Sequence, residues 1–134
     1  MTKPLGRPSG APPPAEAALI DGSALALLPL AAEITERYAQ AFPDEDERYT
    51  PRWREWCTHD NQYVLRWAID DQCGLADLWQ QVSWLARVLD ARGYPLDRLA
   101  RSLELGADVL DERAGPAAAA AVNELRGAAA KLAG

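Results

Sequence analysis

The sequence is poor in cysteine and histidine, with two cysteines and one histidine among 134 residues, and it carries no complete catalytic, metal or nucleotide motif. Cys57 and Cys73 are too few for a disulfide scaffold. The apolar stretch at residues 25–30 is short and follows a proline-rich segment, so it does not resemble a signal-peptide core. No stretch approaches the roughly 20 apolar residues of a membrane-spanning helix. These absences predict a reduced, cytoplasmic protein without a membrane partner.

The chain also lacks an excess of basic residues, since its formal net charge is −6. Arg48, Arg52 and Arg54 follow directly after the acidic run at residues 44–47, so the charges cancel locally. Nucleic acids and anionic membranes both attract clustered lysine and arginine, and we therefore expect neither as a partner. The acidic run is predicted to be a solvated loop, because a calcium-binding loop needs glycine where Tyr49 stands.

Proline is concentrated in the first fourteen residues, and residues 1–20 contain few large apolar side chains. Such a composition cannot bury enough surface to offset the entropy of ordering, so these residues are predicted to form a disordered tail. Residues 21–134 show apolar side chains at helical spacing. They predict an all-α fold, a single-domain bundle of five or six helices with short loops, whose first helix begins near Asp21 or Ser23.

Glycine and proline divide the bundle into helices. Thr50 and Pro51 predict the start of a helical region, but the polar residues 58–61 leave open whether it is one helix or two. Apolar residues at 75–89 form the clearest amphipathic helix in the sequence. Gly93, followed by Tyr94 and Pro95, is expected to take the left-handed conformation that ends this helix.

All five tryptophans lie between Trp53 and Trp84, which is the most distinctive feature of the sequence. They either fill the core between two helices or form a binding surface with aromatic walls. On the second interpretation, the candidate ligand- or partner-binding residues are Trp53, Trp56, His59, Tyr63, Trp67 and Trp84. The helical spacing predicts that Trp67 and Trp79 lie in the core and that Trp56 and Trp84 lie on the outer side.

His59 is the only histidine, and histidine can ligate haem iron, sense pH or act as a base. The alternative interpretation is that His59 is a helix-end or partly buried histidine with a purely structural role, hydrogen-bonded to a neighbouring residue. Its plausible acid-base partners are Asp60 and Asp70. Cys57 and His59 have no second cysteine pair to complete a zinc site, so we expect no metal, and the sequence identifies no cofactor.

The stretch from Trp84 to Pro95, with its Gly93 turn and the helix that follows through Glu104, resembles the end of the helical module that precedes cobalamin-binding or other signalling domains in bacterial regulators. The resemblance implies a helical sensory or interaction module. The Asp-x-His-x-x-Gly motif that supplies the lower cobalamin ligand in that family does not occur, because Asp60, Asn61 and Gln62 follow His59. No site residue is therefore carried over.

Three functions remain open. The first is a non-enzymatic helical module that binds a protein partner or forms a homodimer in bacterial regulation. The second is a bundle that binds a small molecule or cofactor in a pocket lined by tryptophan, histidine and tyrosine. The third is an enzyme without a cofactor, although the sequence favours a protein that is not an enzyme.

Overall fold

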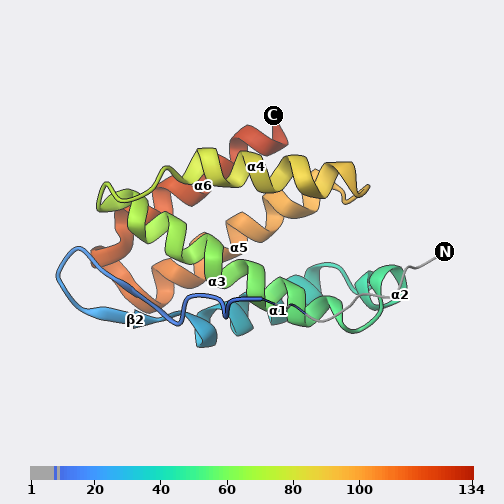
Figure 1. The fold of residues 1–134 in the computed structure, drawn as a ribbon, viewed down its shortest axis with the longest axis horizontal. Helices are drawn as coiled ribbons and strands as arrows, with labels where there is room; N and C mark the ends of the chain where they lie inside the picture. The colour runs from blue at the N-terminus through green and yellow to red at the C-terminus, as the bar shows by residue number, and fades with distance from the viewer. Residues whose placement is uncertain (1–7, 9) are drawn as a thin grey trace.

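The computed structural model describes residues 8 and 10–134, and these form a bundle of α-helices with a small two-stranded sheet on its side (Figure 1). In chain order the elements are β1 (Glu16–Ala18), β2 (Ala24–Ala26), α1 (Leu27–Ala41), α2 (Glu45–Tyr49), α3 (Trp53–Gln72), α4 (Leu78–Ala91), α5 (Leu96–Ala114), a 3-10 turn η1 (Gly115–Ala118) and α6 (Ala119–Ala133). The predicted all-α bundle is confirmed. None of the described helices is long and apolar enough to span a membrane.

The core lies between α1, α3, α5 and α6. Helix α1 packs on α3 and α5, α5 packs along α6, and α4 lies against α3, α5 and α6. The largest fully buried apolar side chains come from all of these helices: Leu27, Ile34, Leu65, Ile69, Leu78, Leu103, Leu110 and Leu125. Between α5 and α6 the buried residues include the small side chains Ala107, Ala121 and Ala128, which allow the two helices to approach closely.

Helix α3 is one continuous helix of 20 residues, which settles the question that the sequence left open. Its polar residues do not break it, because their side chains find partners while the backbone stays helical. The Thr58 hydroxyl lies 2.8 Å from the Thr35 hydroxyl of α1, and the Asn61 amide donates to the carbonyl oxygen of Cys57 at 2.9 Å. Thr50 does not cap α3 with its side chain. It ends α2 with a φ angle of 69°.

The first helix begins at Leu27, so the prediction that it begins near Asp21 or Ser23 was wrong. Instead, β1 and β2 form an antiparallel hairpin in which Ala17 lies opposite Leu25. The Asp21 carboxylate accepts hydrogen bonds from the backbone N–H and the hydroxyl of Ser23, at 2.9 and 2.6 Å, and thereby stabilises the hairpin turn. The same side chain that could have capped a helix therefore closes a turn.

Part of the predicted tail is packed on the bundle, which corrects its boundary at residue 20. Ala17 and Leu19 are buried. Gln62 of α3 donates to the carbonyl oxygen of Pro14 at 3.2 Å, and Arg66 of α3 donates to that of Glu16 at 3.0 Å. Residues 1–7 and 9 of the predicted tail lie outside the described residues.

Replacing Ala17 with aspartate tests whether the hairpin contributes to stability. The side chain at this position is 3% exposed, so an aspartate there would bury a carboxylate without a partner. We expect Ala17→Asp to lower the free energy of unfolding by about 2 kcal/mol in a urea titration. Ala18→Asp places the same group on the exposed neighbour and should change stability by less than about 0.5 kcal/mol. Equal effects of the two substitutions would contradict a packed hairpin.

Gly93 has a φ angle of +77°, which confirms the conformation predicted at the end of α4. The backbone N–H of Tyr94 donates to the carbonyl of Leu89 at 2.9 Å and closes the last turn. A Cβ at Gly93 would meet no atom within 4 Å, so the cost of Gly93→Ala comes from the left-handed backbone alone. We expect a loss of about 1 kcal/mol.

Gly127 supplies the matched control for this prediction. It lies within α6, has ordinary helical geometry, and a Cβ there would also meet no atom within 4 Å. Gly127→Ala should therefore raise the free energy of unfolding by about 0.5 to 1 kcal/mol. Chemical denaturation of both variants should give opposite signs, and a stabilising Gly93→Ala would refute the helix-ending role.

Candidate functional site

Helix α3 carries a row of four aromatic side chains along one side. Trp56, His59, Tyr63 and Trp67 follow one another at spacings of three, four and four residues, which places them on a single helical face. Each ring contacts the next, with centroids 5.6 Å apart for Trp56 and His59, 5.3 Å for His59 and Tyr63, and 6.0 Å for Tyr63 and Trp67. The structure thus brings together four of the six candidate residues.

This row lies on the side of α3 opposite its fully buried residues, and Trp67 at its end also packs against the edge of the core. With 3.6 residues per turn, the fully buried residues Leu65 and Ala68 face roughly the opposite direction. All four aromatic side chains are partly buried and keep some surface exposed to solvent. One flank of the row is formed by the N-terminal segment that Gln62 and Arg66 hold. Helix α4 also packs against α3.

Trp84, on α4, is level with the second half of α3. The two helices run antiparallel: the backbone N–H of Leu78, at the start of α4, donates to the Asp71 carboxylate at 2.6 Å, and Arg92, just after α4, acts electrostatically on Asp60. Trp84 lies about 80° from Arg92 around the axis of α4, on the side away from the buried residues Leu78, Val82 and Ala86. It is 52% exposed. We call the rings of Trp56, His59, Tyr63, Trp67 and Trp84 the outer aromatic face.

Trp53 is the one candidate that the structure places elsewhere. It is 5% exposed, its ring lies 5.5 Å from that of Tyr38, and its indole N–H donates to the Asp46 carboxylate at 2.6 Å. Trp67 and Trp79, which were expected to lie in the core, are only partly buried at its edge. Trp67 belongs to the outer aromatic face. The sequence pattern placed it inside because its spacing from Trp53 approximates whole helical turns, but the accumulated offset turns it outward.

Among the described residues of this region, only His59 and Asp60 have the geometry of an acid-base pair. Its Nδ1 atom lies 3.0 Å from the Asp60 carboxylate. Burial raises the pKa of the Asp60 carboxyl, and the hydrogen bond from His59 opposes that shift. The other proposed partner, Asp70, instead accepts a hydrogen bond from Arg66 at 2.9 Å. His59 therefore lies between the rings of Trp56 and Tyr63 and is hydrogen-bonded to the Asp60 carboxylate.

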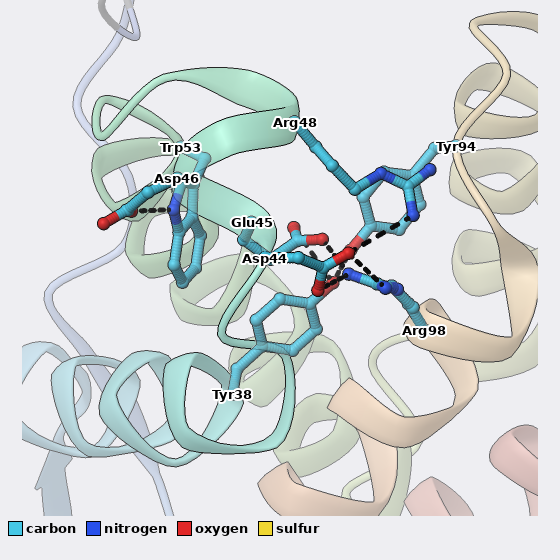
Figure 2. A network of polar contacts seen from close by, with 8 residues as sticks. All are labelled: Tyr38, Asp44, Glu45, Asp46, Arg48, Trp53, Tyr94 and Arg98. Atoms are coloured by element: carbon cyan, nitrogen blue, oxygen red, sulfur yellow. Dashed lines mark hydrogen bonds and ion pairs between the residues drawn. The ribbon is translucent and has the colours of Figure 1, made fainter.

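A second cluster, shown in Figure 2, connects the α1–α2 corner with α5 through polar side chains. The Arg98 guanidinium donates to the Asp44 carboxylate at 2.9 and 3.1 Å and also to the Glu45 carboxylate. The Tyr38 hydroxyl donates to Glu45 at 3.3 Å and is hydrogen-bonded to the Tyr94 hydroxyl. Together these groups hold the short helix α2 against the bundle.

The prediction that the acidic run is a solvated loop was wrong for Glu45, which is 2% exposed. Burial raises the pKa of its carboxyl, while the hydrogen bond and the charge of Arg98 lower it. Burial likewise raises the pKa of the Tyr38 and Tyr94 hydroxyls, so both stay protonated at neutral pH. Within the described residues, every buried side-chain nitrogen and oxygen has a hydrogen-bond partner. The cluster is therefore a satisfied structural network.

The structure gives little support for thiol chemistry, metal binding or a small-molecule pocket. Burial raises the pKa of the Cys57 thiol to about 12, so it is not a thiolate at neutral pH. In the part of the chain that the structure describes, no three histidine, cysteine or acidic side chains gather in a metal-binding group. Two surface depressions lie beside the hairpin and between α5 and α6, and neither is lined by an aromatic side chain.

No protein-family model matches the chain, and no curated protein or solved structure matches it either.

Proposed function

We propose that the chain is a non-enzymatic helical module that binds a protein partner or a second copy of itself through the outer aromatic face, and that it acts in bacterial regulation. The single observation that carries the proposal is Trp84, a large ring that is 52% exposed in the middle of a helix and level with a row of four further aromatic side chains. Aromatic residues, tryptophan above all, contribute most to binding where proteins meet. The resemblance of residues 84–104 to helical modules of bacterial regulators supports the regulatory role.

The alternative of a small-molecule pocket is not proposed. A ligand site of that kind is concave and buries most of its ligand. The depressions beside the hairpin and between α5 and α6 are lined mainly by alanine and charged side chains, away from the tryptophans. A row of partly exposed rings on a convex helix is better suited to another protein.

Photo-crosslinking tests the proposal. Benzoylphenylalanine replaces Trp84 in one variant of the full chain and Leu28 in the other, and both are irradiated in the host cell. Leu28 is a matched control because it is 53% exposed and lies on α1. We expect a discrete adduct, either a dimer or one partner, from position 84 and none from position 28. Equal labelling at both positions, or no adduct at either, would refute the proposal.

A further inference from the structure

Helix α2 is held against the bundle by polar side chains more than by apolar packing (Figure 2). Of its five residues, all within the described part of the chain, only Glu45 is buried, and Tyr49 is partly buried. Its attachments are polar contacts: Arg98 with Asp44 and Glu45, Tyr38 with Glu45, and Trp53 with Asp46. Water can replace hydrogen bonds of this kind, so detaching α2 costs little of the apolar burial that stabilises the other helices.

Thr50, which ends α2, has a backbone conformation that is costly for its side chain. It is the one residue other than glycine with a positive φ angle in the described part of the chain. Its φ and ψ angles of 69° and 155° lie in a region that is essentially restricted to glycine, and a side chain branched at Cβ fits there poorly. Pro51 follows and disfavours the helical conformation for Thr50. Extended backbone is therefore the relaxed alternative, and reaching it redirects the chain that precedes Thr50.

We propose that residues 43–51, with α2 at their centre, form a strained latch that opens as one unit at Thr50 while the bundle stays folded. The closed state persists because the contacts of Arg98 and Trp53 outweigh the strain at Thr50. Opening relaxes Thr50 and returns the carboxylates of α2 to water, and both changes offset part of the lost contacts. Opening the latch therefore costs less free energy than unfolding the bundle. The latch is an addition to the proposed function and does not depend on it.

Opening changes which groups the molecule presents. In the closed state the Arg98 guanidinium is occupied by Asp44 and Glu45. The indole N–H of Trp53 is likewise occupied by Asp46. The open state frees both donors and exposes more of the Trp53 ring, which is buried when the latch is closed. Segments of low local stability are the ones that move in conformational switches, and this segment gives the module two states with different surfaces.

Hydrogen exchange of the full chain, followed by NMR, tests the latch. Three protons report on it: the backbone N–H groups of Arg48 and Thr50, each bonded to a carbonyl of α2 or its N-terminal flank at 3.0 Å, and the indole N–H of Trp53. If the segment opens as one unit, the three protons share one protection factor, at least about 100-fold below that of the core amide of Leu65. Low concentrations of urea should leave their exchange unchanged, because opening exposes little surface.

Two substitutions distinguish a latch from a frayed short helix. Thr50→Gly removes the strain and, even with the greater freedom of glycine in the open state, should slow the exchange of all three protons by about fivefold. Asp44→Asn removes a carboxylate that binds Arg98 and should speed all three by about tenfold. Asp108→Asn is the matched control, since it removes an exposed ion pair of α5 with Arg126, and it should change none of them.

Unequal protection factors for the three protons would overturn the inference, as would a Trp53 indole N–H that exchanges only when the bundle unfolds. An effect of Asp44→Asn confined to the backbone amides would mean that α2 frays and does not open as a unit. Faster exchange in Thr50→Gly would show that no strain is stored at this residue. None of these results bears on the crosslink from position 84, so the latch and the proposed function can fail separately.

Discussion

Replacing Trp53 with alanine is expected to lower the free energy of unfolding by about 3 to 5 kcal/mol. The substitution removes a ring that is 5% exposed and packed 5.5 Å from the Tyr38 ring. It also removes the indole N–H that donates a hydrogen bond to the Asp46 carboxylate. Because α3 begins at this residue, the loss should affect the whole bundle. Urea denaturation followed by circular dichroism measures the effect without relying on tryptophan fluorescence.

Trp84→Ala is the control for this prediction, since it deletes the same side chain from an exposed position. It should change stability by no more than about 0.5 kcal/mol. Trp67→Ala and Trp79→Ala should fall between the two, because both side chains are partly buried at the edge of the core. A larger loss for Trp84→Ala than for Trp53→Ala would reverse the assignment of the inner and outer surfaces.

Removing the guanidinium of Arg98 is expected to cost about 3 to 5 kcal/mol. Arg98→Ala leaves the Glu45 carboxylate, 2% exposed, without its positive partner. It also frees Asp44, so α2 loses its attachment to α5. Thermal and chemical denaturation of Arg98→Ala at neutral pH should both show the loss.

Two comparisons isolate the buried charge as the cause. Arg101→Ala removes an arginine one turn further along α5 whose ion pair with Glu104 is exposed, and it should cost less than about 1 kcal/mol. Adding Glu45→Gln to Arg98→Ala should recover part of the stability, because no uncompensated carboxylate then remains. A double variant no more stable than Arg98→Ala would show that Arg98 acts by some other means.

Local signals in the sequence predicted much of the fold. Gly93, followed by Tyr94 and Pro95, correctly predicted where α4 ends, because only glycine takes a φ angle of +77° without an energetic cost. The hairpin was missed, because its strands are rich in alanine and lack the β-branched side chains that mark strands. It is stabilised by burial of Ala17 and by donors on α3, which no local pattern reveals.

The buried network could not be predicted for a similar reason. Glu45 lies in a run of four acidic residues, and its burial depends on Arg98, which is 53 residues further along the chain. Four of the six candidate site residues do form a continuous row, because their spacing along one helix is a local property. Trp53 was grouped with them because it lies on the same predicted helix, whereas its packing against Tyr38 is a tertiary contact.

The claim that α3 and α4 present one binding surface is tested most directly by crosslinking from position 84 in a Tyr63→Ala background. The substitution changes α3, while the photoreactive group sits on α4. We expect the adduct from position 84 to be largely lost while the free energy of unfolding falls by only about 1 kcal/mol. An undiminished adduct in a folded Tyr63→Ala protein would show that the aromatic row of α3 takes no part in binding, and would contradict the claim.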